Sequence, residues 1–133
     1  MSFDVHAERY VSLVTFKRDG GEVATPIWFA PDPDDDALLW MYTNRTSWKV
    51  KRIRNQQGRA RVAPCDARGG LRGEFEEAEA RVIDDASSAE FERAFETLID
   101  RYGWQARAVL FFSRFGGRYS DRCALAVRLT ERA

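Results

Sequence analysis

The sequence predicts a mainly β domain in which short antiparallel strands form a small barrel and helices lie at its periphery. Six runs of β-branched, aromatic and aliphatic residues have the length and composition of strands. Tight turn signals separate several of these runs, and the helical patterns are inserted between strands instead of alternating with them. The chain of 133 residues fits a single domain, residues 1–133, which can bury a core without disulfides or a structural metal.

The first two predicted strands form a hairpin. Residues 10–17 are rich in Val, Leu, Thr and aromatic side chains, and residues 23–29 are the return strand. Asp19-Gly20-Gly21 lies between them, and these residue types tolerate the positive φ that a hairpin turn requires. Pro26 cannot donate a ladder hydrogen bond, so it indicates an edge strand, a bulge, or a place where something other than a strand approaches.

The next segment leads from a strand into a short basic helix. The Asp- and Pro-rich run 31–36 predicts a solvated turn, and residues 37–43 a third strand. Asn44, Thr46 and Ser47 are good helix N-caps, and Val50 and Ile53 have the spacing of a buried helical stripe.

The start of this helix has the composition of a phosphate site. A helix N-terminus offers unpaired N–H groups and the positive end of the helix dipole. Lys49 lies in the first turn, and hydroxyl side chains come just before it. These features favour phosphate binding. The alternative is an amphipathic surface helix whose Lys and Arg side chains only face water.

The rest of the chain alternates between strands and helices. Gln56-Gln57-Gly58 ends the basic helix, residues 59–65 form a fourth strand, and residues 66–70 form a turn. Residues 74–83 alternate as a fifth strand, with Ala78, Ala80 and Val82 on one face and Glu77, Glu79 and Arg81 on the other.

The C-terminal part is predicted to contain two helices and a last strand. Ser87 and Glu90 match a capping box, apolar residues follow at helical spacing from Phe91 to Tyr102, and Gly103 ends the helix. Residues 104–115 are predicted as a second helix. The last strand carries four apolar residues on one face: Cys123, Leu125, Val127 and Leu129.

Composition excludes several classes of function. Lys plus Arg (21) equals Asp plus Glu (21), so no global field favours nucleic acid or a membrane surface. Two cysteines, Cys65 and Cys123, are too few for a disulfide framework. The sequence also shows no signal-peptide pattern and no apolar run of about 20 residues. Together these observations predict a cytoplasmic protein. His6 is the single histidine, so no metal set or Ser-His-Asp triad is expected, and any redox chemistry needs a cofactor.

An ordered series of short segments resembles the pyridoxamine-phosphate-oxidase-like split-barrel family. Within that family the chain is most similar to small flavin/deazaflavin oxidoreductases that use coenzyme F420. The similarity extends over about residues 10–82 and depends on four segments: Thr25-Pro26-Ile27-Trp28-Phe29, Tyr42-Thr43-Asn44, residues 47–54 and Val62-Ala63-Pro64-Cys65-Asp66.

This resemblance implies a six-stranded antiparallel split β-barrel that forms a homodimer, with two cofactor sites at the subunit interface. It implies that residues 25–29 line the tricyclic ring of F420 or FMN and that Thr43, Ser47 and Lys49 hold the cofactor phosphate. Lys51 and Arg52 are expected close by. The family has Gly where this chain has Trp48, which either points away, stacks on a cofactor tail or partly fills the site. The implied cofactor-binding set is Thr25, Pro26, Ile27, Trp28, Phe29, Thr43, Ser47, Trp48, Lys49, Lys51 and Arg52.

The function expected from this resemblance is that of a flavoprotein oxidoreductase that transfers a hydride to or from a small unsaturated organic substrate. F420 is preferred over FMN because its acidic tail would suit Lys51, Arg52 and Arg54. Two alternatives are a non-catalytic protein that binds flavin, deazaflavin or a tetrapyrrole, and a nucleic-acid-binding module based on residues 49–61. The neutral net charge disfavours the second of these.

Overall fold

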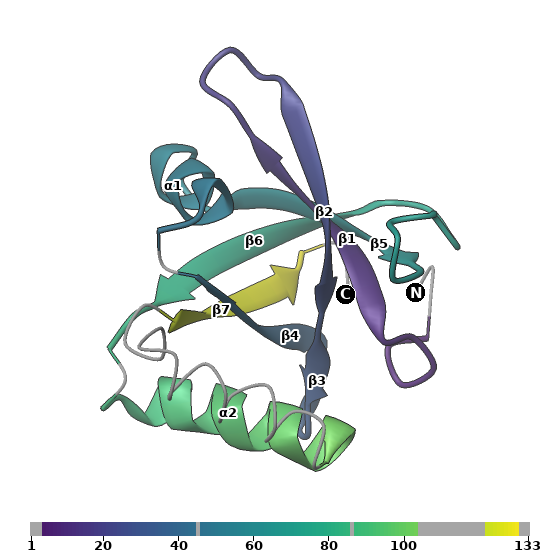
Figure 1. Cartoon of the computed structure of the whole chain (residues 1–133), viewed down its shortest axis with the longest axis vertical. Coiled ribbons are helices and arrows are strands. Elements are labelled where there is room, and N and C mark those ends of the chain that lie inside the picture. The colour runs from purple at the N-terminus through teal and green to yellow at the C-terminus, as the bar shows by residue number, and fades with distance from the viewer. Residues whose placement is uncertain (1–3, 45, 86, 104–121, 131–133) are drawn as a thin grey trace.

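The computed structural model describes residues 4–44, 46–85, 87–103 and 122–130. Within these ranges there are seven strands and two helices (Figure 1). In chain order they are β1 (Tyr10–Phe16), β2 (Glu22–Trp28), β3 (Ala30–Asp32), β4 (Asp35–Asn44), α1 (Trp48–Asn55), β5 (Arg59–Cys65), β6 (Glu76–Ile83), α2 (Ala89–Tyr102) and β7 (Arg122–Leu129).

The strands form one curled antiparallel sheet in the order β2-β1-β5-β6-β7-β4-β3. Its two edge strands, β2 and β3, are consecutive in the chain and are separated only by Phe29. One bent segment, residues 22–32, therefore pairs first with β1 and then with β4, and brings the two edges of the sheet together. The split-barrel prediction is confirmed, and the expected six strands become seven because this segment breaks at Phe29.

The interior of the barrel holds the main hydrophobic core. It is formed by the inward-facing residues of the strands, and one end is covered by α1. Val50 and Ile53, the predicted buried stripe of α1, are 1% and 2% exposed. On β7, Cys123, Leu125, Val127 and Leu129 are buried, as predicted.

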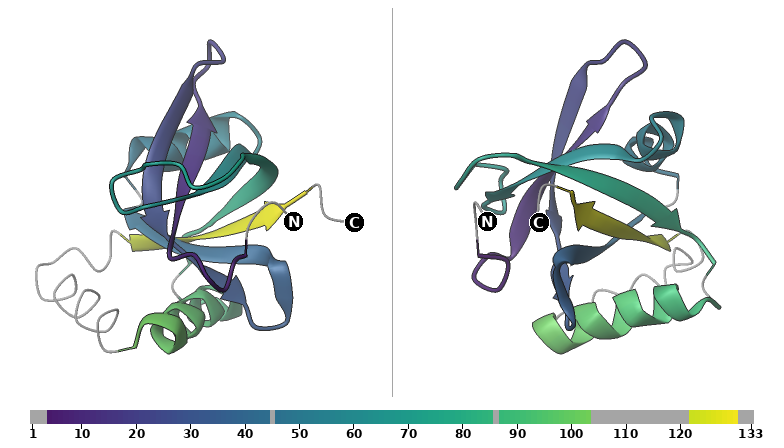
Figure 2. Two further views of the ribbon diagram at one scale, coloured as in Figure 1. Left: turned by 90° about the vertical axis from the view of Figure 1, so that its right-hand side faces the viewer. Right: turned by 180° about the vertical axis from the view of Figure 1, so that it is seen from behind.

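A second cluster lies between the outer surface of the sheet and α2. Phe91 and Ala94 of α2 pack against Trp40 of β4 and against Ala124 and Ala126 of β7. Figure 2 shows α2 lying along this side of the barrel, away from α1. β4 and β7 are consequently covered on both faces, which explains the continuous burial of residues 123–127.

The turns follow the sequence prediction closely. Gly20 has a φ of 89°, and Lys17 N–H donates to the Gly21 carbonyl across the hairpin (2.8 Å). Gly58 has a φ of 83° just after α1. Pro26 lies in edge strand β2, where its missing N–H breaks no ladder.

Two local predictions are corrected by the structure. The solvated turn predicted for residues 31–36 is confined to Pro33 and Asp34: Ala30–Asp32 is strand β3, β4 begins at Asp35, and Asp32 is only 4% exposed. The N-cap of α2 is Ser88, whose Oγ accepts from Phe91 N–H (3.1 Å), while Glu90 pairs with Arg81 and does not complete a capping box. The predicted helix 104–115 lies outside the described residues. No helix in the described ranges is long and apolar enough to cross a membrane.

Candidate functional site

The junction between β4 and α1 is shaped by the side chain of Asn44. Its Oδ1 accepts from Thr46 N–H (2.9 Å) and from the Thr46 hydroxyl (2.7 Å), and its carbonyl accepts from Ser47 N–H (3.0 Å). These bonds turn the chain sharply, so that Ser47 takes the N-cap position with extended backbone angles. The hydroxyl and amide residues of this segment therefore build the turn that presents the start of α1.

The N-terminus of α1 lacks the acceptors that usually satisfy a helix start. The Ser47 side chain makes no capping bond, and the first turn contains no acidic residue. The Ser47 Oγ is buried, yet it has no hydrogen-bond partner among the residues that the structure describes. The amides of the first turn have no intrahelical acceptor by geometry. This arrangement fits an external anionic group with several oxygen acceptors.

Lys49 adds a positive charge at the same junction. Its side chain is half-buried, and burial, together with the nearby charge of Arg52, lowers the pKa of its ammonium group. The thiol of Cys123 acts in the opposite direction and so lies close to Lys49. Cys123 on β7 pairs with Thr43 on β4, which is 5% exposed. The structure thus brings the predicted phosphate residues Thr43, Ser47 and Lys49 to one end of β4.

Lys49 has no carboxylate partner in the described part of the chain. A partly desolvated cation without a counterion is unfavourable for folding, since burial penalises its charged form. A bound phosphate would supply the missing charge. The residues present therefore fit the phosphate of a flavin-type cofactor.

The predicted ring-binding strand, residues 25–29, divides between the core and the surface. Ile27 and Phe29 are buried in the barrel interior and are closed to a ligand in the single chain. Thr25 and Trp28 are half-buried, and Pro26 is exposed. The Trp28 ring is stacked on Tyr102 with centroids 5.1 Å apart and an interplanar angle of 20°, and Tyr10 meets it edge-on at 6.2 Å.

The C-terminus of α2 fixes this strand in place. The Tyr102 hydroxyl lies within hydrogen-bond distance of the carbonyls of Phe29 and Arg9, the latter at 3.0 Å, and its single hydrogen serves these two acceptors. Arg101 Nη1 donates to the Phe29 carbonyl (3.1 Å), and Nη2 donates to those of Val5 (2.9 Å) and Glu8. Sequence analysis missed the role of Arg101, because an Arg near a helix C-terminus normally indicates only a favourable dipole interaction.

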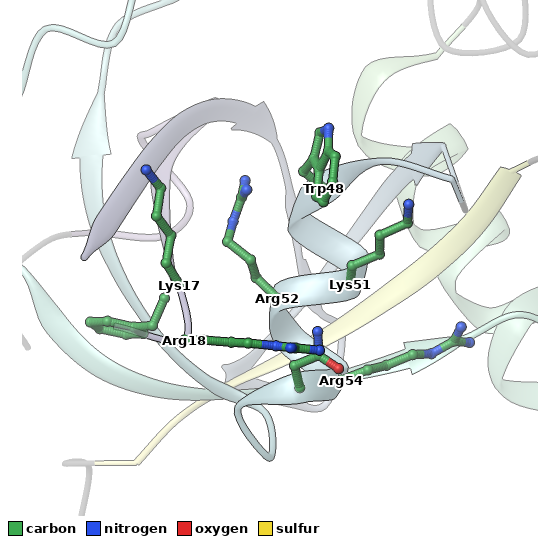
Figure 3. Close-up of a pocket in the computed structure, with 8 residues that line it drawn as sticks. Lys17, Arg18, Trp48, Lys51, Arg52 and Arg54 are labelled. Carbon is green, nitrogen blue, oxygen red and sulfur yellow. The ribbon is translucent and has the colours of Figure 1, made fainter. Parts of the chain in front are cut away.

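Trp48, Lys51 and Arg52 border a groove that Lys49 does not border. It is an open groove of about 670 Å³ between α1 and the end of β1 (Figure 3). The groove is bordered by Phe16, Lys17, Arg18, Trp48, Lys51, Arg52, Arg54 and Asn55, and not by Ser47 or Lys49. Trp48 is 69% exposed and does not fill the junction beside Ser47. Lys17 and Arg18 were not foreseen, since only the folded hairpin brings them to α1.

The sequence matches no protein-family model and none of the curated proteins. Solved structures do match. An F420 reductase has a TM-score of 0.60 and 18% identity, and the match covers 95% of this chain and 90% of that protein. The heme storage protein HutZ from Vibrio cholerae has a TM-score of 0.69 and 9% identity, over 96% of this chain and 87% of that protein.

A protein from Listeria innocua assigned as a pyridoxamine 5'-phosphate oxidase has a TM-score of 0.60 and 12% identity, over 92% of this chain and 85% of that one. At these identities the likeness concerns the fold. The chain has the split-barrel fold of pyridoxamine-phosphate-oxidase-like proteins, as its sequence segments predicted. The same fold carries both a reductase and a heme storage protein, so the function is argued from the site.

Proposed function

We propose that this protein binds a flavin-type cofactor, F420 or FMN, by its phosphate at the N-terminus of α1 and works as an oxidoreductase. The observation that carries the proposal is the buried Ser47 hydroxyl, which has no partner among the described residues, close to the partly desolvated Lys49 at a helix start without a side-chain cap or an acidic residue. A bound anion would give the Ser47 hydroxyl a hydrogen-bond acceptor and the Lys49 ammonium group a counterion. These are the residues for which the sequence resemblance implies contact with the cofactor phosphate.

The chain's own residues would bind and orient the cofactor. Ser47 and Lys49 hold the phosphate, together with Thr43 and the first-turn amides. The strand of residues 25–29 borders the ring through Thr25, Pro26 and Trp28, the three of its residues that are not buried. When bound, the ring carries a hydride to or from a small unsaturated organic substrate. The barrel wall keeps water from one side of it, and a second copy of the chain, in a homodimer, would cover the other.

F420 and FMN differ in what lies beyond the phosphate. F420 continues into an acidic tail, and beyond Lys49 the helix α1 carries three further basic residues, Lys51, Arg52 and Arg54, the last two in its final turn. FMN ends at its phosphate and makes no use of these side chains. The surplus of cations on α1 therefore favours F420.

A second candidate is a non-catalytic protein that binds a tetrapyrrole, and the likeness to HutZ supports it. Against it stands the position of His6, the one histidine of the sequence. His6 is exposed, and its Nε2 lies 2.9 Å from Asp36 Oδ1, far along the chain from the α1 junction. A histidine-ligated heme would have to break this pair. The flavin-type cofactor needs no such change.

Calorimetric titration with FMN and, separately, with F420 tests the proposal. We expect at least one to bind, and Lys49→Met to weaken that binding by about 10- to 150-fold, the loss of one charge-assisted hydrogen bond. For FMN, Lys17→Met is the matched control, because Lys17 is exposed and borders the groove that contains neither Ser47 nor Lys49. Binding of neither cofactor, or an unchanged affinity in Lys49→Met, would contradict the proposal.

Activity and assembly are tested separately from binding. Turnover of the bound cofactor with an unsaturated acceptor distinguishes an oxidoreductase from a storage protein. Sedimentation measurements should give a dimer, since one protomer leaves the ring open on one side. A monomer that binds the cofactor tightly would contradict the interface site.

A further inference from the structure

The groove beside α1 concentrates positive charge on a chain that is neutral overall. Lys17 and Arg18 come from the end of β1 and the hairpin, and Lys51, Arg52 and Arg54 come from α1. None of the described residues that border the groove is acidic. In Figure 3 the side chains of Lys17, Arg52 and Lys51 extend in the same direction, with Trp48 beside them. The groove is therefore a cationic surface built from two separate elements.

Most of these cations have no carboxylate partner. Arg54 Nη2 pairs with Asp84 (2.6 Å), and Arg52 Nε donates to the neutral hydroxyl of Thr15 (2.8 Å). Lys17, Arg18 and Lys51 make no ion pair with any residue in the described ranges. Like charges held this close repel one another, and a ligand with several negative charges would relieve that repulsion. A single phosphate would leave most of the charge unbalanced.

Trp48 adds a flat aromatic surface to the cationic one. Its side chain is 69% exposed, and Lys51 Nζ lies 4.5 Å from the ring centroid. This cation–π contact holds the indole next to the groove while most of it remains in contact with solvent. An exposed indole flanked by basic side chains is the arrangement on which nucleobases stack.

We propose that the groove binds a nucleoside polyphosphate, with its base stacked on Trp48 and its phosphates between Lys17, Arg18 and Arg52. The volume of about 670 Å³ suits a ligand of this size. The groove adjoins the cofactor site proposed above: Ser47 and Lys49 do not border it, but Lys51, Arg52 and Arg54, which would face the acidic tail of F420, do. A nucleotide in the groove would therefore leave room for FMN and would compete with the tail of F420.

Calorimetric titration of the full chain with ATP tests this site, with tripolyphosphate and adenosine as partial ligands. ATP should bind more tightly than either partial ligand, because only ATP uses both the indole and the cations. Equal binding of tripolyphosphate and ATP would show that the base does not stack on Trp48 and would overturn the nucleotide proposal. Tighter binding of a single-stranded oligonucleotide, with a steep salt dependence, would assign the groove to nucleic acid and overturn it.

Two variants test the two halves of the groove. Trp48→Ala should weaken ATP binding about tenfold and leave tripolyphosphate unchanged, as expected for the loss of one stacked base. The double variant Lys17→Glu/Arg18→Glu should weaken both ligands by tenfold or more. Leu71→Ala and Arg68→Glu are the matched controls, since both residues are exposed and lie on another loop. Equal losses in the controls would overturn the proposal.

FMN has no acidic tail, so experiments with FMN separate the groove proposal from the cofactor proposal. Saturating FMN should leave ATP binding unchanged, and Lys49→Met should lose FMN but keep ATP. If ATP fails to bind while FMN binds, the groove proposal alone is wrong. Displacement of ATP by FMN, or loss of ATP in Lys49→Met, would place the nucleotide at Ser47 and Lys49 and overturn the separate site.

Discussion

Arg93 of α2 holds the carboxylate of Asp32 in β3 through two parallel hydrogen bonds. Arg93 Nε lies 2.6 Å from Asp32 Oδ1, and Nη2 lies 3.1 Å from Oδ2. Trp40 Nε1 donates to the same Oδ1 at 2.9 Å. The carboxylate is thus the point at which the helix, the short strand β3 and the β4 tryptophan are joined.

The stability of the fold should depend on pH through Asp32. Its hydrogen bonds with Arg93, more than any other contact, lower the pKa of Asp32 from 3.8 to about 2. A carboxyl whose folded pKa lies below its unfolded value stabilises the fold above the unfolded value and loses that effect as the pH falls. We therefore expect about 2 kcal/mol of unfolding free energy to be lost between about pH 4 and pH 2.

Asp32→Asn isolates this contribution. The variant should be less stable than the wild type by about 1–3 kcal/mol at pH 7, because Trp40 and Arg93 lose part of their acceptor. The difference should shrink at pH 2.5, where the wild-type carboxyl is partly protonated. Urea unfolding at the two pH values measures it. A difference of the same size at both would show that Asp32 acts through packing and not through its charge.

Asp32 also shows where sequence reasoning fails. In the run of residues 31–36 nothing distinguishes this aspartate from its neighbours, and the composition indicates a solvated turn. Its partner Arg93 is 61 residues away, on a helix whose buried face was correctly predicted. Periodicity reports which face of an element is apolar, but it carries no information on which polar residues two elements bring together.

Local signals were reliable where local geometry decides the structure. The Asp-Gly-Gly hairpin, the Val50 and Ile53 stripe and the alternation of β6 each depend on neighbours a few residues apart. For the site, the segment around Ser47 and Lys49 was visible in sequence because one turn and one helix build it. The groove with Lys17 and Arg18 was not, since it exists only after the hairpin packs beside α1.

The carbonyl contacts of Arg101 and Tyr102 predict a graded response to substitution. Arg101→Met removes donors to the carbonyls of Phe29, Val5 and Glu8 and should destabilise the protein by about 2–3 kcal/mol. Tyr102→Phe removes only the hydroxyl, keeps the ring stacked on Trp28, and should cost about 1 kcal/mol. Thermal or urea unfolding gives both values. A larger loss in Tyr102→Phe than in Arg101→Met would contradict this order.

Gly58 and Gly20 allow the cost of backbone strain to be separated from the cost of a steric clash. Both have positive φ, so an alanine at either position costs about 1–2 kcal/mol in backbone strain. At Gly58 a Cβ would also lie 2.6 Å from the Ala80 carbonyl oxygen, whereas at Gly20 it would meet nothing within 4 Å. Gly58→Ala should therefore be clearly less stable than Gly20→Ala in urea unfolding. Similar losses would show that β6 moves aside without cost.

Substitution by alanine should lower mainly the stability at one helix N-cap serine and mainly the cofactor affinity at the other. Ser88 caps α2 by accepting from Phe91 N–H, whereas the Ser47 hydroxyl caps nothing in α1. Ser88→Ala should then cost about 1 kcal/mol of stability and leave FMN and F420 binding unchanged. Ser47→Ala should cost less than about 0.5 kcal/mol, because it removes a buried polar atom that has no described partner, and it should weaken cofactor binding about tenfold. Urea unfolding and calorimetric titration of both variants give the four values. A stability loss in Ser47→Ala equal to that in Ser88→Ala, with cofactor affinity intact, would mean that the Ser47 hydroxyl serves the helix and not a ligand.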